Sequence, residues 1–295
     1  MVTDASQTKE RATQPLAPGL YLVATPIGNL EDITLRALRI LESADLIACE
    51  DTRQTQKLLN HFGIQTPTVS YHMHNEGPRA EELTSRLKQD ARIALVSDAG
   101  TPGISDPGVE LVAAAIAAGA AVFPVPGANA AISALIASGL STDSFVFHGF
   151  LPAKAGQRRT ALEELPRNGM THVFYEAPHR IAETLGDIEA VFGAEQHIVL
   201  ARELTKLHEE FLRGPVSGLR SQLASRAAIR GEMVLLLAPD TAGNTQRQSI
   251  AAEVAALMQS EGLDEKDALK RVARERGIGK SEAYRELQRE QSRKR

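Results

Sequence analysis

A glycine-rich loop with a polar Ser-Asp turn is the part of this chain whose residue types and spacing best predict a ligand site. The segment RIALVSDAGTPGISDPG, residues 92–108, begins as an apolar strand over Ile93–Val96 and turns polar at Asp98. Its glycines let the backbone approach a ligand closely, and its prolines hold the loop rigid. Loops at the carboxyl ends of parallel strands bind small molecules in open α/β sheets. A ligand-free βα turn is the alternative, but the segment is long and unusual in composition, so we expect a ligand site.

Two further loops have the same character. Residues 23–34, VATPIGNLEDIT, leave a strand through Pro26 and Asn29, and residues 126–129, PGAN, close another strand and open a helix. Free N–H groups at the start of a helix can hydrogen-bond a ligand acceptor. Three such loops at one sheet edge predict a site built mostly from backbone contacts.

Alternating strand and helix signals supply the framework that positions these loops. Strands are expected at 20–24, 46–49, 93–96 and 121–125, with helices at 33–41, 52–61, 81–88 and 109–118, which is the βαβ pattern of a parallel sheet covered on both faces. A second set follows, with strands expected at 145–148, 172–175, 197–201 and 233–238 and helices at 128–138, 156–165, 181–192 and 216–227. The pattern therefore predicts an α/β protein.

Composition shifts set the expected domain boundaries. We expect a disordered leader at 1–17, an N-terminal α/β domain at 18–130, a C-terminal α/β domain at 131–240 and a helical, basic extension at 246–295. The extension is expected to form three short helices with a Gly-Ile-Gly turn, which is similar in outline to a helix-turn-helix.

Charge and cysteine content limit the classes of protein to which this chain can belong. The 295 residues have a net charge of −4, but residues 266–295 contain eleven Lys or Arg against five Asp or Glu, so a basic tail follows an acidic body. Such a tail suggests a polyanionic partner. The single cysteine, Cys49, excludes an intramolecular disulfide and fits a cytoplasmic location. No apolar run approaches the length of about 20 residues that a membrane span needs, so we expect no membrane association.

Two common site types are not expected. The G-x-G-x-x-G fingerprint follows none of the predicted strands, which argues against a standard nicotinamide or flavin site. His72 and His74 form an H-x-H pair, but no third ligand stands nearby, so we expect no metal.

Seven motifs in order resemble one known family. They are TPIGNLEDIT, CEDTR, SDAGTPGISDPG, PGANA, FYEAPHR, ARELTK and GEMVLLL, spread over roughly residues 18–240. Together they are similar to the ribosomal small-subunit RNA methyltransferase I family of the tetrapyrrole methylase superfamily.

The resemblance implies two α/β domains of the tetrapyrrole methylase type, with the cofactor in the cleft between them, and a small helical extension. It implies S-adenosylmethionine-dependent methylation of a cytidine ribose 2′-hydroxyl in the decoding region of 16S rRNA in the small ribosomal subunit, by a homodimer. The cofactor-binding positions carried over are Pro26, Ile27, Asp98, Gly100, Thr101, Pro102, Gly103, Ile104, Asn129, Ala130, Tyr175, Glu176, Ala177, Leu204 and Met233.

A ribose hydroxyl is a poor acid, so a general base would help the transfer. The candidate catalytic residues are Glu176, Glu203 and Lys206, with His179, Arg202 and Glu232 as further candidate acids or bases. Charged residues at strand ends also form plain salt bridges, and that alternative stays open for each of them. Asp98 is expected to orient the cofactor or its own loop.

RNA contact requires positive charge. Lys154, Arg158 and Arg159 lie in the loop LPAKAGQRRT and are expected to clamp phosphates, as are Arg271 and Arg274 in the tail. The plain alternative is a solvated helix face, and part of the tail charge is expected to pair with glutamates one turn away.

Two other functions remain open. The chain can methylate a tetrapyrrole or another small molecule, although neither needs a basic tail. It can also be an RNA-binding assembly factor without catalysis, although the intact glycines of the loops argue against that reading.

Overall fold

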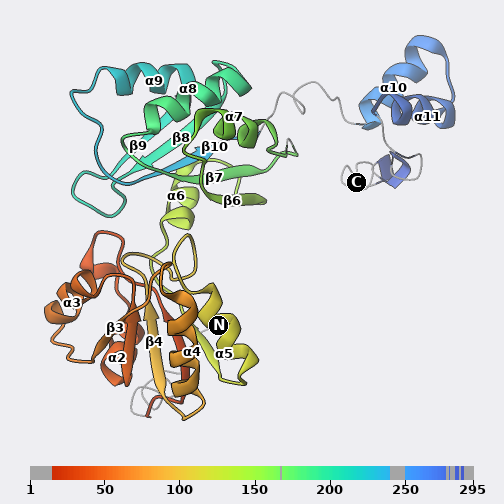
Figure 1. The fold of residues 1–295 in the computed structure, drawn as a ribbon. Helices are drawn as coiled ribbons and strands as arrows, with labels where there is room; N and C mark the ends of the chain where they lie inside the picture. Colours follow the sequence, from red (N-terminus) through yellow and green to blue (C-terminus); the bar gives the residue numbers. More distant parts are fainter. Residues whose placement is uncertain are drawn as a thin grey trace. The chain divides into compact units, whose positions relative to one another are not determined.

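The computed structural model describes residues 15–166, 168–239 and 250–276, together with 279, 283–285, 287 and 288. The chain divides into two compact units (Figure 1). The first comprises the residues up to 165 and 171–238, and the second comprises 166–170 and the residues from 239 onward. The expected leader at 1–17 lies, apart from 15–17, outside the described residues.

A five-stranded parallel sheet begins the first unit. Its strands are β1 (Gly19–Val23), β2 (Leu46–Cys49), β3 (Thr68–Ser70), β4 (Arg92–Val96) and β5 (Val122–Val125), in the spatial order β3-β2-β4-β1-β5. Every neighbouring pair is parallel. All five strands therefore end at the same edge, and that edge holds the three predicted loops.

Helices cover both faces of this sheet, as the strand pattern predicted. Helices α2 (Leu35–Ser43) and α3 (Thr52–His61) pack into one apolar cluster, and α4 (Glu76–Leu87) and α5 (Val109–Ala117) pack into the other. A short 3-10 helix, Leu30–Asp32, precedes α2. Side-chain caps define two of the starts, because Thr34 accepts from the Ala37 N–H and Asp51 accepts from the Arg53 N–H.

The second sheet is mixed. Its strands are β6 (Phe145–Phe150), β7 (Thr171–Glu176), β8 (His197–Arg202), β9 (Glu210–Pro215) and β10 (Met233–Leu237), in the order β6-β7-β10-β8-β9. Only β6 and β7 pair in parallel, and β10 runs antiparallel to both β7 and β8. The start of β10 at Met233 therefore lies beside the ends of β7 at Glu176 and of β8 at Arg202.

Helix α6 (Ala130–Ser138) joins the two sheets. It follows β5 of the first sheet, yet its buried alanines and Leu135 pack against one face of the second sheet (Figure 1). The opposite face is covered by α7 (Ala155–Glu163), α8 (Ile181–Phe192) and α9 (Val216–Ala224). This sharing of α6 explains why both sheets form one compact unit.

Three local elements differ from the sequence prediction. Strands β3 and β9 were missed, because each lies at a sheet edge and neither shows a long apolar run. Helix α4 begins at Glu76 and not at Glu81, although Gly77 and Pro78 look like helix breakers. A proline in the first helical turn loses no intrahelical hydrogen bond, so the helix tolerates it there.

The second unit contains α10 (Ile250–Glu261) and α11 (Glu265–Arg276) around an apolar cluster that includes Val254, Leu269 and Leu287. Much of the third expected helix, 280–289, lies outside the described residues. Within the described part of the chain, none of the helices has the length and apolar character needed to cross a membrane.

Candidate active site

A cavity of about 340 Å³ lies in the first unit, where loops of the first sheet meet strand ends of the second. Its volume falls in the range of small-molecule sites, which is about 300–1,000 Å³. The lining residues are Ile27, Asp98, Ala99, Gly100, Thr101, Ile104, Ser105, Asp106, Ala130, Phe150, Tyr175, Glu176, Ala177, Pro178, Leu204, Glu232, Met233 and Val234.

Hydrogen bonds tie the three loops of the first sheet together. The Thr25 N–H donates to the Gly100 carbonyl at 2.8 Å, and the Gly100 N–H donates back to the Thr25 carbonyl at 3.0 Å. The Thr101 hydroxyl donates to the Ala128 carbonyl at 3.1 Å and accepts from the Asn129 amide at 3.4 Å. The predicted convergence of the loops is therefore present in the structure.

Most of the residues expected to touch the cofactor line this cavity. Those that do are Ile27, Asp98, Gly100, Thr101, Ile104, Ala130, Tyr175, Glu176, Ala177, Leu204 and Met233. Those that are not among its lining residues are Pro26, Pro102, Gly103 and Asn129. Asn129 instead caps α6, because its side chain accepts from the Ile132 N–H. Contact between any of these residues and a cofactor stays a prediction.

Sequence reasoning missed five of the lining residues, namely Ser105, Asp106, Phe150, Pro178 and Val234. Ala99 lies inside the 98–104 loop expected to touch the cofactor, and Glu232 was a further candidate acid or base. Asp106 belongs to the same glycine-rich loop as Asp98, so its acidic type in that loop was an available signal. No sequence signal marked Phe150 and Val234 as cavity residues, because only the strand order of the second sheet brings them to the cavity.

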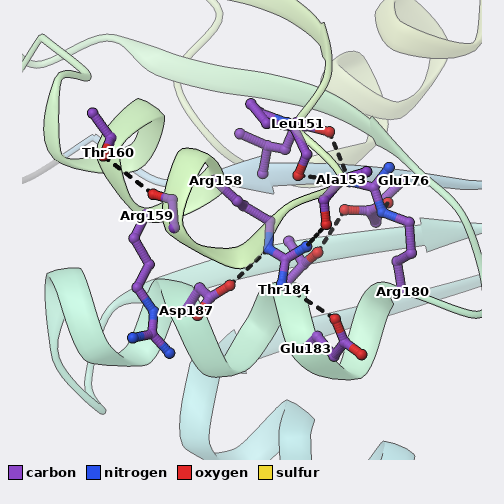
Figure 2. A network of polar contacts seen from close by, with 12 residues as sticks. Leu151, Ala153, Arg158, Arg159, Thr160, Glu176, Arg180, Glu183, Thr184 and Asp187 are labelled. Carbon is purple, nitrogen blue, oxygen red and sulfur yellow. Dashed lines mark hydrogen bonds and ion pairs between the residues drawn. The ribbon is translucent and has the colours of Figure 1, made fainter.

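Glu176 is a buried carboxylate with both oxygens in use. The Thr184 hydroxyl donates to Oε2 at 2.6 Å, the Ala177 N–H donates to Oε1 at 2.8 Å, and Arg180 Nε lies 3.4 Å from Oε1 (Figure 2). Arg180 also donates to the Leu151 carbonyl at 2.7 Å. This geometry makes Glu176 an anchor for the 175–177 backbone and leaves little capacity for proton transfer.

Lys206 forms two ion pairs at the end of β8. Its Nζ lies 2.9 Å from Glu203 Oε1 and 2.9 Å from Glu232 Oε2. Partial burial lowers the pKa of Lys206, but the two carboxylates outweigh it, so the net pKa lies above the usual value. A hydrogen bond from Lys206 holds the pKa of Glu203 below its usual range. Both groups therefore stay charged near neutral pH, which favours the salt-bridge alternative for them.

Lys206 also packs against the loop of residues 23–34, which follows β1. A Cβ placed on Gly28, which has φ +152°, would lie 2.4 Å from Lys206 Cγ. The loop after β8 thus packs against the turn after β1, beside the cavity residues Ile27 and Leu204. Only glycine fits position 28 without moving this lysine.

The three predicted RNA-binding residues near α7 differ from one another in how exposed they are. Arg158 is only 1% exposed and is enclosed by Asp187 Oδ2 at 2.7 Å, the Ala153 carbonyl at 3.1 Å and Glu183 at 3.3 Å (Figure 2). A guanidinium buried in this way is not presented to a phosphate, so the structure argues against Arg158 as part of the clamp. Arg159 is 57% exposed although it also pairs with Asp187, and Lys154 is exposed at the start of α7.

The tail residues lie in the second unit. Arg274 is exposed, whereas Arg271 pairs with Glu261. In the described ranges no group of three or more His, Cys, Asp or Glu is arranged to hold a metal ion.

The profile described as Tetrapyrrole (Corrin/Porphyrin) Methylases matches residues 19–220. The chain is 50% identical to "Ribosomal RNA small subunit methyltransferase I" of Halalkalibacterium halodurans, over 90% of this chain and 93% of that protein. The chain belongs to the tetrapyrrole methylase family, in its ribosomal RNA small subunit methyltransferase I branch.

Other relatives agree with this assignment. The chain is 53% identical to the Vibrio cholerae protein with the same name, over 75% of this chain and 77% of that protein. The solved uroporphyrin-III-C-methyltransferase of Thermus thermophilus matches with a TM-score of 0.54 and 21% identity, covering 78% of this chain and all of that one. A cobalt precorrin-4 methyltransferase matches with a TM-score of 0.55 and 16% identity, over 74% and 94% of the two chains. These two likenesses show the fold.

Breaking the buried Arg158–Asp187 pair is expected to destabilise the protein. Arg158→Ala should lower the free energy of unfolding by about 3 kcal/mol, because a buried carboxylate loses its enclosed partner. Arg159→Ala, the matched control on the same carboxylate, should cost less than about 1 kcal/mol because Arg159 is exposed. Urea denaturation followed by circular dichroism measures both. Equal losses would contradict the structural role of Arg158.

Proposed function

We propose that this protein transfers the methyl group of S-adenosylmethionine to the ribose 2′-hydroxyl of a cytidine in the decoding region of 16S rRNA. The observation that supports it best is the cavity, which the family's motif residues line in a chain half identical to relatives named ribosomal RNA small subunit methyltransferase I. Bound S-adenosylmethionine supplies an electrophilic methyl group on a positively charged sulfur.

The residues of the cavity suit such a cofactor. Ile27, Leu204 and Met233 provide apolar surface, and Asp98 and Asp106 provide negative charge. Burial, Glu50 and Asp98 raise the pKa of Asp106 to about 6, so this wall of the cavity is short of positive charge. A sulfonium cation would relieve that repulsion. The carboxylates would bind and orient the cation, and the loop N–H and carbonyl groups would fix its polar ends.

Exposed cations would bind the RNA backbone. We assign this role to Lys154, which precedes α7, and to Arg159 within α7. We assign it also to Arg271 and Arg274 of α11 in the helical extension. Arg158 is left out because it is buried. We further propose that the protein acts in the cytoplasm as a homodimer, on the small ribosomal subunit.

Labelled methyl transfer tests this function. Small subunits and naked 16S rRNA from a strain lacking the protein are incubated with labelled S-adenosylmethionine, and the product is mapped by mass spectrometry. A 2′-O-methylcytidine at one decoding-region position is expected. Transfer to porphyrinoids instead would establish a tetrapyrrole methylase, and cofactor binding without any transfer would indicate a non-catalytic assembly factor.

Removing the Asp98 charge should weaken cofactor binding. Asp98→Ala is expected to raise the dissociation constant of S-adenosylmethionine about 10- to 100-fold, as for loss of a hydrogen bond to a charged group. Isothermal titration calorimetry measures it, with the exposed Asp143→Ala as a matched control that keeps the parent affinity. Unchanged affinity in Asp98→Ala would remove this residue from the site.

Reversing the two exposed charges near α7 should weaken RNA binding alone. Lys154→Glu with Arg159→Glu is expected to lower the slope of log affinity against log salt by about 1 to 2, because each phosphate contact releases counterions. Affinity for S-adenosylmethionine should not change. Lys88→Glu, an exposed charge after α4, is the control. An unaltered salt slope in the double variant would show that the loop is not a phosphate clamp.

A further inference from the structure

Asp106 lines the cavity, and beyond its negative charge the proposed function gives it no step in the reaction. It lies in the loop after β4 and lines the cavity with Ser105. Ser105 adopts the left-handed region with φ 62°, a conformation that costs energy for a residue other than glycine and that clusters at functional sites. Two residues after Asp106, the Gly108 N–H donates to Glu76 at 2.9 Å. The backbone on both sides of Asp106 is therefore held in a defined position.

The other cavity carboxylates are already engaged. Glu176 is fully buried with both oxygens in use, and Glu232 pairs with Lys206 at 2.9 Å. Asp98 Oδ1 accepts from the Asp51 N–H at 3.0 Å. Among the residues that the structure describes, Asp106 forms no ion pair with Lys, Arg or His. Within the described residues it is thus the cavity carboxylate that neither an ion pair nor a backbone N–H already holds.

Two acidic groups and one tyrosine interact electrostatically with Asp106. Burial first, and then the charges of Glu50 and Asp98, raise the pKa of Asp106 to about 6, with a partial offset from the Ser97 hydroxyl. Tyr175 belongs to the second sheet, and its pKa is raised by burial and also by the charge of Asp106. Asp106 follows β4 of the first sheet and Tyr175 belongs to β7 of the second, and both line the cavity.

We propose that the Asp106 carboxylate is the general base that accepts the proton of the RNA hydroxyl during methyl transfer. This inference rests on the proposed function. As the hydroxyl oxygen forms its bond to the methyl carbon, its proton passes to an Asp106 oxygen. The carbon–sulfur bond breaks and its electron pair stays on sulfur. Carboxylate and sulfonium both become neutral, so charge is conserved.

The position of Asp106 favours this step physically. A partly buried cavity solvates a separated carboxylate and sulfonium poorly, and the reaction removes both charges. A base that titrates near the working pH gives general-base catalysis the best balance of ionised fraction and proton affinity. Neutral Asp106 then has to lose its proton to solvent before the next turnover.

Asp106→Asn separates this role from binding. The rate of methyl transfer at saturating substrates should fall at least about 100-fold, the usual lower bound for loss of a general base. Affinity for S-adenosylhomocysteine, which lacks the positive charge, should stay within about threefold of the parent by calorimetry. Asp106→Ala should behave in the same way, and it serves as the second variant if the amide disturbs the loop.

Glu50→Gln is the matched control. Glu50 follows β2, is absent from the cavity lining and raises the pKa of Asp106 through its like charge. The variant should keep the parent rate at about pH 8 and shift the acidic limb of the pH–rate profile to lower pH. In Asp106→Asn that limb should disappear.

Thermal stability of the cofactor-free protein is a readout independent of activity. The folded-state pKa of Asp106 is raised above its unfolded value, so the folded form binds the proton more tightly and stability falls as pH rises between about 4 and 6. Asp106→Asn should therefore melt at a higher temperature than the parent above about pH 6 and at a similar temperature near pH 4.

The outcomes separate the two proposals. Methyl transfer by the parent together with a rate within about threefold in Asp106→Asn, at unchanged cofactor-product affinity, overturns the role of Asp106 and leaves the function intact. No transfer to RNA by the parent, with S-adenosylmethionine bound, overturns the proposed function itself. A large loss of S-adenosylhomocysteine affinity in both Asp106 variants would make Asp106 a binding residue and also overturn the inference.

Discussion

Two backbone hydrogen bonds between Thr25 and Gly100 hold the cavity together. They join the loops that leave two neighbouring parallel strands, β1 and β4, and they use groups that would otherwise need water or another partner. Around this bridge, Thr101 reaches the third loop through Ala128 and Asn129. A cavity lined by irregular backbone requires such internal satisfaction, because unpaired N–H and C=O groups away from water are costly.

The directions of its strands allow the second sheet to form one wall of the cavity. Because β10 runs antiparallel between β7 and β8, its first residues lie beside the ends of both neighbours. Tyr175, Leu204 and Met233, far apart in sequence, thus gather at one place. Buried polar contacts then fix this wall, with Glu176, Thr184 and Arg180 as its centre, and Arg158 attaches α7 to α8 beside it.

Several cationic side chains near the site pair with groups of the protein itself. Arg158, Arg180 and Lys206 each satisfy internal carboxylates or carbonyls, so their charge is balanced within the protein. The carboxylates of Asp98 and Asp106 line the cavity. Within the described residues, the framework cations are paired and Asp106 has no ion pair, which is the arrangement that the proposed binding of a sulfonium cation requires. It also distinguishes Arg158 from Arg159, which sequence alone treats as equivalent.

The amino-acid sequence by itself determined the parallel sheet, most of its helices, the three loops that converge at its edge and the family, because periodicity, glycine and proline positions and local motifs are properties of short segments. It did not reveal the edge strands β3 and β9, whose formation depends on a neighbouring strand. Only the tertiary structure decided that Arg158 is buried, that Glu176 is engaged on both oxygens, and that Asp106 and Tyr175 line one cavity. Those outcomes depend on contacts between residues distant in sequence, and no local pattern encodes which charge finds which partner.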